Sequence, residues 1–88
     1  MSQLQIVIVT PESTALDKQV DSVVLPLFDG EKGILANHAP MIGRLGKGKL
    51  RIKDGSSEES YQIDGGFVQV ESNTVSILTG SSEAVTGE

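Results

Sequence analysis

Short runs of hydrophobic residues, separated by turn-forming residues, recur along the whole chain. Leu4–Val9 is an almost continuous aliphatic run that ends at Thr10 and Pro11. Such a run is typical of a strand that is covered on both faces, either within its own sheet packing or by a partner. Lys49–Lys53 and Ser60–Asp64 instead alternate between apolar and polar residues. That alternation predicts strands with one face in water.

The remaining apolar runs predict further short strands, at Val20–Leu25, Ile34–Leu35, Met41–Leu45, Phe67–Glu71 and Thr74–Leu78. Glycine, proline, asparagine and serine predict turns between the strands, at Pro11–Thr14, Phe28–Gly33, Gly46–Gly48, Asp54–Ser57 and Ser72–Asn73. No stretch shows the 3.6-residue period of a helix, and the tail from Gly80 is small and polar. The pattern therefore predicts an all-β antiparallel sandwich or barrel with little or no helix.

Length and composition narrow this prediction. Eighty-eight residues are enough for a single domain, 1–88. Because Phe28, Tyr61 and Phe67 are the only aromatic residues, we expect an aliphatic core. The net charge of −5 opposes binding to nucleic acid or to an anionic membrane surface. With no signal peptide and no membrane-spanning run in the sequence, we expect a soluble domain on the cytosolic side.

The candidate chemistry is sparse. With no cysteine and one histidine, disulfides and thiolate zinc sites are excluded, and neither a metal nor a cofactor is predicted. His38 could be a general base, but no serine or cysteine nucleophile adjoins it, and Asp29 and Glu31 are the nearest acids. A role in a turn is the favoured interpretation. A contact with another subunit remains an alternative.

Two glycine or asparagine positions predict unusual backbone. Asn37 suits a left-handed turn, where few residues other than glycine fit. Gly65-Gly66 is no phosphate loop, because the Lys-Ser/Thr of that motif is absent; it predicts a bulge or the close approach of another backbone.

Four cations follow one another at alternate positions and indicate a solvated strand face, at Lys47, Lys49, Arg51 and Lys53.

The order and spacing of several short motifs resemble those of the epsilon subunit of rotary F-type ATP synthases. The resemblance covers essentially the whole chain and is carried by Gly30–Leu35, His38–Ile42, Gly48–Ile52, Gly65–Val70 and Asn73–Leu78. Family members usually have Pro-Gly before His-Ala-Pro, where this chain has Ala36-Asn37. Asparagine tolerates the left-handed conformation, so the turn is expected to survive.

The resemblance implies a flattened antiparallel β-sandwich of about ten short strands. It also implies a place in the central rotor, with the gamma subunit and the ring of c subunits as partners. In the family, the Gly-Glu-x-Gly turn and the His-Ala-Pro loop lie at the one end of the sandwich that meets the c-ring. Carried over, the expected c-ring contacts are Glu31, His38, Ala39 and Pro40, and the structural turn residues are Gly30, Gly33, Asn37, Gly65 and Gly66.

The resemblance implies a non-catalytic subunit that couples rotation of the c-ring to the gamma subunit and the catalytic head. The coupling ion is a proton or sodium. The expected location is peripheral, on the cytoplasmic side of the inner (plasma) membrane, without direct membrane insertion. Family members continue into a two-helix domain that can restrain hydrolysis or bind ATP, and neither property is expected of these residues. The alternatives are a stand-alone small β-sandwich interaction module and, less favoured, a small enzyme or an oligonucleotide-binding barrel.

Overall fold

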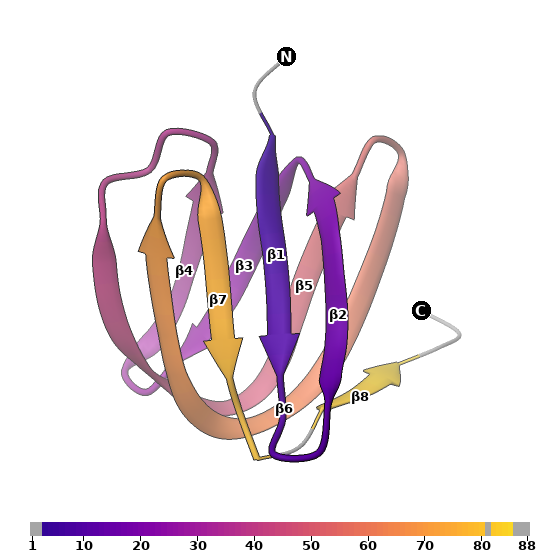
Figure 1. The fold of residues 1–88 in the computed structure, drawn as a ribbon, viewed down its shortest axis with the longest axis vertical. Helices are drawn as coiled ribbons and strands as arrows, with labels where there is room; N and C mark the ends of the chain where they lie inside the picture. The colour runs from indigo at the N-terminus through magenta and orange to yellow at the C-terminus, as the bar shows by residue number, and fades with distance from the viewer. Residues whose placement is uncertain (1–2, 81, 86–88) are drawn as a thin grey trace.

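The computed structural model describes residues 3–80 and 82–85, and all regular structure in these ranges is β-strand (Figure 1). The eight strands are β1 (Leu4–Val9), β2 (Thr14–Val20), β3 (Ser22–Leu27), β4 (Gly30–Leu35), β5 (Met41–Asp54), β6 (Ser57–Glu71), β7 (Thr74–Leu78) and β8 (Ser82–Val85). They form one hydrogen-bonded sheet in the order β2-β1-β7-β6-β5-β3-β4, and β8 pairs with β6 outside this path. The all-β prediction is confirmed. One pair departs from the antiparallel rule, because β1 and β7 run parallel.

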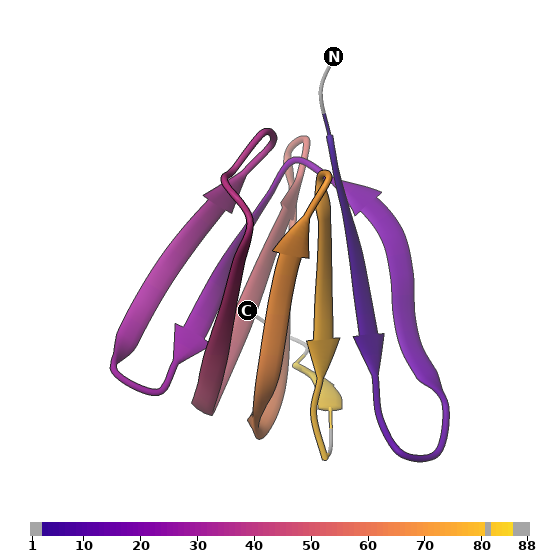
Figure 2. The same cartoon turned by 60° about the vertical axis from the view of Figure 1, so that its left-hand side comes forward.

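The sheet curls into two layers because β5 and β6 are long and bend together (Figure 2). Segments 41–45 of β5 and 66–71 of β6 join β7, β1 and β2 in the layer that is nearer the viewer in Figure 1, the front layer. Segments 47–54 of β5 and 57–64 of β6 join β3, β4 and β8 in the back layer. Since β5 and β6 each serve both layers, the eight strands supply ten short strand segments, in line with the roughly ten that the family resemblance implies.

An aliphatic core fills the space between the layers. Among the described residues, fifteen hydrophobic side chains are at most 2% exposed, and all of them are valine, leucine or isoleucine. In β1, Leu4, Ile6 and Ile8 are fully buried, whereas Val7 and Val9 point outward and are half-buried. Of the two alternatives for this run, coverage of both faces within its own fold is therefore excluded, and coverage by a partner stays a prediction. Its outward valines lie on an open face of the front layer.

Glycines permit the bend at the lower end of the molecule. Gly66 has a φ of +118°, and a Cβ built on it would lie 2.0 Å from the backbone oxygen of Leu78. This is the close backbone approach that the Gly65-Gly66 pair indicates. Across from it, a Cβ built on Gly46 would lie 3.1 Å from the backbone oxygen of Leu27. The sequence predicts a turn at Gly46–Gly48, and this prediction is wrong. β5 continues through these residues and pairs with β6 before and after them.

Three strands differ from the sequence prediction. β4 occupies most of the stretch predicted as a turn, and the actual reversal is at Phe28 and Asp29. β8 lies in the small, polar tail, where the sequence predicts no strand. β2 was missed because its inward positions are Leu16, Lys18 and Val20, so a cation interrupts the apolar alternation.

Candidate functional site

The loop of residues 36–40 lies at the upper end of the sandwich, between β4 and β5. The backbone N–H of His38 donates to the carbonyl of Leu35 at 3.2 Å, and its Nδ1 lies 2.7 Å from the carbonyl oxygen of Ala39. A carbonyl only accepts, so Nδ1 is the donor in this contact. No carboxylate in the described part of the chain orients the ring. His38 thus has the geometry of a turn residue, and the contacts that a general base requires are missing there.

Asn37 fixes this loop to the turn between β6 and β7. Its backbone N–H donates to Oδ1 of Asn73 at 2.5 Å, and Nδ2 of Asn73 donates to Oδ1 of Asn37 at 3.4 Å. Asn37 has a φ of 68°, the left-handed conformation that its sequence context predicts. The backbone oxygen of Asn73 in turn accepts from the N–H of Gln5 at 2.8 Å. Two turns and the start of β1 are therefore tied together at the upper end.

Glu31 lies near the opposite end of β4 from this loop. It pairs with Pro26 beside the β3–β4 turn, and its Oε1 accepts a hydrogen bond from Nη2 of Arg51 at 3.2 Å. At about 3.3 Å per residue, β4 carries the chain roughly 13 Å from Glu31 to Leu35, and His38 lies beyond. The expectation that Glu31 and the His-Ala-Pro loop share one end of the sandwich is wrong, because β4 separates them.

The predicted turn residues fall in different settings. Gly30 begins β4 directly after the reversal and has a φ of 139°. Gly65 and Gly66 lie at the bend within β6 and do not reverse the chain. Gly33 was expected in a turn but lies inside β4, paired with Val24, with no left-handed φ. The glycines of residues 28–33 indicate one long reversal, whereas the chain reverses only at Phe28 and Asp29.

Large hydrophobic side chains gather on the outer surface of the front layer. Five such side chains are exposed in the described part of the chain, and four lie here: Phe28 (68%), Ile42 (77%), Phe67 (60%) and Leu78 (56%). Strand pairing places Phe28, Arg44, Phe67, Leu78 and Val9 side by side in one row across β5, β6, β7 and β1. We call the outward side chains of this surface the apolar face: Val7, Val9, Phe28, Ile42, Phe67 and Leu78.

Arg44 is the cation within this row. Its guanidinium carbon lies 4.8 Å from the centre of the Phe28 ring, a cation–π contact. The N–H of Phe28 donates to the carbonyl of Arg44 at 2.8 Å, which holds the two residues side by side. Phe67 is opposite Arg44 on the neighbouring strand. The charge is therefore set among aromatic side chains.

Two shallow hollows border the apolar face. One, of about 340 Å³, lies at the lower end, and its lining is almost entirely apolar: Val9, Thr10, Pro11, Gly66, Leu78, Thr79 and Gly80. The other, of about 410 Å³, lies at the upper end and is lined by Pro40, Met41, Ile42, Gln69, Val70 and Glu71. Val9, Leu78 and Ile42 thus belong both to the face and to its hollows. The apolar face is therefore bordered by a hollow at each end.

The outer surface of the back layer has the opposite character. The cations Lys49, Arg51 and Lys53 point outward from β5 and are exposed, as the sequence predicts for a solvated strand face. Glu31 pairs with Arg51 on this surface. Leu35, on β4, is the one exposed large hydrophobic residue that lies outside the apolar face in the described part of the chain. In the described part of the chain, most exposed large hydrophobic side chains therefore lie on the front layer, whereas Lys49, Arg51 and Lys53 lie on the back layer.

A charged cluster closes the open side of the sandwich between the layers. Nζ of Lys18, on β2, lies 3.0 Å from Oε2 of Glu59 and 3.9 Å from Oδ2 of Asp54, both in the back layer. The hydroxyl of Tyr61 donates to Oε1 of Glu59 at 3.5 Å. The hydrogen bond with Glu59 raises the pKa of Lys18. Burial raises the pKa of Tyr61, and the charge of Glu59 adds to the rise.

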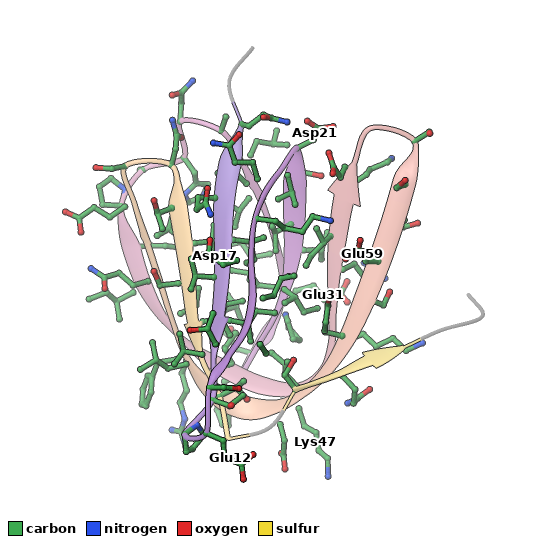
Figure 3. All side chains as sticks on the ribbon, turned by 45° about the vertical axis from the view of Figure 1, so that its right-hand side comes forward. Glu12, Asp17, Asp21, Glu31, Lys47 and Glu59 are labelled. Atoms are coloured by element: carbon green, nitrogen blue, oxygen red, sulfur yellow. The ribbon has the colours of Figure 1, made fainter. Side chains whose placement is uncertain are left out.

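Charged side chains also lie at the two ends of the molecule. Figure 3 shows Asp21 at the upper end and Glu12 and Lys47 at the lower end. The carboxylate of Asp21 accepts from the N–H of Gly55 at 2.6 Å and so caps the β5–β6 turn. The described residues contain no group of three or more His, Cys, Asp or Glu side chains that could hold a metal ion. They contain no helix long and apolar enough to cross a membrane.

Comparison with known proteins shows which family the chain belongs to. Residues 3–85 match the model of the family described as ATP synthase, Delta/Epsilon chain, beta-sandwich domain. The chain belongs to this family. The ATP synthase epsilon chain of Rhodopirellula baltica is 54% identical over 77 residues, which cover 88% of this chain and 60% of the relative. That of Symbiobacterium thermophilum is 42% identical over 84 residues, covering 94% of this chain and 60% of the relative. This member of the delta/epsilon family spans about 60% of the length of these relatives.

Solved structures agree with the family assignment. A chain of the Euglena gracilis mitochondrial ATP synthase, solved as OSCP/F1/c-ring in rotational state 1, superposes with a TM-score of 0.90 at 25% identity. The superposition covers 96% of this chain and 54% of that chain. A chain of the Tetrahymena thermophila mitochondrial ATP synthase central stalk and c-ring shares the fold, with a TM-score of 0.76 at 17% identity. The resemblance found in the sequence is thereby confirmed.

Sequence reasoning missed the apolar face. The sequence predicts strands at Met41–Leu45 and Phe67–Glu71, but which of their apolar side chains point outward is not part of that prediction. Period-2 alternation within Met41–Leu45 and Phe67–Glu71 could have separated the outward Ile42 and Phe67 from the inward Leu45, Val68 and Val70. The row itself could not have been found, because it depends on pairing between strands that are distant in sequence.

Proposed function

We propose that this domain is the rotor-coupling part of an ATP synthase epsilon-type subunit, which links rotation of the c-ring to the gamma subunit and the catalytic head. The family match supports the assignment, and the two solved relatives come from assemblies that contain the c-ring. The coupling ion is a proton or sodium in this proposal. The subunit is peripheral to the membrane, on the cytoplasmic side, and non-catalytic.

The apolar face is the observation that carries this proposal. Contiguous apolar surface that is exposed on a monomer marks a protein-interaction site, because leaving it in water is unfavourable. On this chain the exposed aromatic and aliphatic side chains gather on the front layer, whereas the back layer is charged. We propose that the gamma subunit covers the apolar face. The half-buried Val7 and Val9 then become buried, which accounts for the continuous aliphatic run of β1.

The edge strand β4 and the loops at its two ends are the proposed contact with the c-ring. Five of the six residues of β4 are exposed, and Ile34 alone points into the core. Glu31 lies near one end of this strand, and His38, Ala39 and Pro40 follow its other end. A partner that lies along the edge can touch both groups. A partner that meets only one end of the sandwich cannot.

A coupling subunit must be stiff, and the fold supplies this through ordinary packing. The fifteen buried aliphatic residues form one interdigitated cluster between the layers. The Lys18–Glu59 pair and the Asn37–Asn73 hydrogen bonds tie the open side and the upper end. No group of the described residues has the nucleophile, base and orienting partner of a catalytic site. Transmission of force thus requires no chemistry on this chain.

The experiment is co-purification of this chain with the gamma subunit of the same synthase. Ile42→Ser and Phe67→Ser each remove one exposed apolar side chain from the face, and we expect each to reduce the bound fraction at least about tenfold. Leu35→Ser is the matched control, since Leu35 is 65% exposed but lies on β4 of the back layer. It should bind gamma like the wild type. Circular dichroism establishes that all three variants fold.

The outcomes separate the two proposed contacts. If Ile42→Ser and Phe67→Ser bind gamma as well as Leu35→Ser does, the apolar face is not the gamma contact. For the c-ring, Glu31→Gln and His38→Gln are made singly and together in the assembled synthase. We expect each to lower proton pumping per ATP hydrolysed and the double variant to lower it further. Unchanged pumping in the double variant would contradict the β4-edge contact.

A further inference from the structure

Arg44 lies in the middle of the row that crosses the apolar face. Phe28 is beside it on one side and Phe67 is opposite it on the next strand. Beyond Phe67 the row continues with Leu78 and Val9. Any partner that covers Phe28 and Phe67 therefore also covers Arg44. The guanidinium then loses its water.

No carboxylate in the described part of the chain neutralises Arg44. The ion pairs there use Lys18 and Arg51 as the cations, and the guanidinium of Arg44 makes no hydrogen bond. Asp29, the next residue in the turn after Phe28, forms no ion pair with it, nor does Glu71 on the same side of the sheet. Glu71 instead accepts from Gln69 at 3.2 Å. Arg44 therefore has no ion-pair partner in the described part of the chain, and Gln69 and Glu71, polar side chains on this side of the sheet, bond to each other.

An arginine in this position cannot adapt by losing its proton, since the guanidinium stays charged at all accessible pH values. Burying it without a counter-charge is strongly unfavourable. Its guanidinium carbon lies over the Phe28 ring at 4.8 Å from the centroid, and the guanidinium N–H groups make no hydrogen bond in the described part of the chain. Those N–H groups match the two oxygens of a carboxylate, which they bind side by side.

We propose that Arg44 binds a carboxylate of the partner, so that the surface that packs on the apolar face carries an aspartate or glutamate opposite Arg44. This inference rests on the proposed function, because it concerns what the gamma subunit presents to that face. The complementary surface is accordingly apolar around one acidic side chain. Arg44 selects partners that supply the acid and penalises apolar surfaces that lack it.

The test measures the dissociation constant for the gamma subunit of the same synthase. Arg44→Met removes the charge and keeps an unbranched side chain, and we expect at least about 30-fold weaker binding, the loss typical of truncating one member of a buried charge pair. Arg44→Lys keeps the charge but not the planar N–H edge, and we expect an intermediate loss of about tenfold. Circular dichroism confirms that both variants fold.

Lys49→Met is the matched control. It removes one positive charge, as Arg44→Met does, but from the back layer, and should leave the dissociation constant within about twofold of the wild type. Charge exchange then identifies the partner residue. Arg44→Glu should abolish binding, and replacing the opposing acid of gamma by arginine should restore it at least about tenfold.

Three results would count against the inference, and they differ from one another. If Arg44→Met binds like Lys49→Met while Ile42→Ser binds weakly, the face is the gamma contact and Arg44 has no acidic partner. If every acid-to-arginine change in gamma fails to rescue Arg44→Glu, the counter-charge is not a side-chain carboxylate of gamma. If neither Ile42→Ser nor Arg44→Met weakens binding, the proposed function of the face fails with it.

Discussion

The backbone N–H of Asn37 donates to the side-chain Oδ1 of Asn73, across 36 positions of sequence, at 2.5 Å. Both residues have left-handed backbone, with φ of 68° and 60°. Asparagine is among the few residues other than glycine that adopt this conformation at modest cost, and its amide can also bond to a neighbouring backbone. Each asparagine thus shapes its own turn, and Asn73 also holds the other turn in place.

Replacing Asn73 separates these two roles. Asn73→Ala forces an ordinary residue into left-handed backbone and removes the bonds to Asn37, so we expect the free energy of unfolding to fall by about 2 kcal/mol. Asn73→Gly removes the bonds but suits the backbone, and should cost about 1 kcal/mol. Urea denaturation monitored by circular dichroism gives both values. Equal losses for the two variants would mean that backbone strain is unimportant at this turn.

Gly66 is the position where the fold is least tolerant of a side chain. Its φ is +118°, and an added Cβ would lie 2.0 Å from the backbone oxygen of Leu78. Since backbone on both sides would have to move, Gly66→Ala should lower the free energy of unfolding by at least about 3 kcal/mol. Gly33→Ala is the control, because nothing lies within 4 Å of its added Cβ and its φ is not left-handed. That variant should remain within about 0.5 kcal/mol of the wild type in the same urea titration.

The two faces of β1 should respond differently to truncation. Ile6 is fully buried, so Ile6→Ala leaves a cavity in the core and should cost about 2–5 kcal/mol. Val7 points to the open face, and Val7→Ala should cost about 1 kcal/mol or less in the isolated chain. Thermal and urea denaturation of the two variants provide the comparison. A loss from Val7→Ala as large as that from Ile6→Ala would show that the outer side of β1 is covered within the chain itself.

The parts of the fold that depend on neighbouring residues could be predicted from the sequence. Asp54–Ser57 and Ser72–Asn73 are turns because the residues in them favour reversal, and both are where the pattern puts them. The alternation in Lys49–Lys53 likewise reports which side of the strand meets water. These signals are local, so no tertiary information is required to interpret them.

The parts that depend on distant residues could not. Lys18 occupies an inward position of β2 because Glu59, in the other layer, pairs with it, and nothing near Lys18 in the sequence indicates that partner. The separation of Glu31 from His38 likewise depends on β4 forming a strand against β3. Without that pairing, the glycines around Glu31 look like one long turn. The apolar face was missed for the same reason, since its row joins five segments of the chain.

The Lys18–Glu59 pair gives the fold a dependence on alkaline pH. The pKa of Lys18 is raised above its ordinary 10.5, chiefly by the hydrogen bond with Glu59, so the folded state favours the charged amine. Its stabilising contribution is complete below pH 10.5 and is lost as pH rises through the higher pKa of the folded state. Burial raises the pKa of Tyr61 above 10.0, so the folded state favours the neutral phenol and ionisation also opposes folding as pH rises. Both groups act in the same direction.

We therefore expect the free energy of unfolding to be level from pH 8 to about 10 and to fall at higher pH. Lys18→Met removes the amine and should make that fall shallower, and Tyr61→Phe should do so independently, because each deletes one of the titrating groups. The double variant should show the weakest dependence of the three. Urea titrations at fixed ionic strength measure this, since salt screens the exposed part of the pair.

Lys49→Met is the control, because Lys49 has no ion-pair partner in the described part of the chain. Its free energy of unfolding should fall as steeply with pH as that of the wild type. If Lys18→Met and Lys49→Met give the same curve, the Lys18–Glu59 pair makes no pH-dependent contribution to the free energy of unfolding.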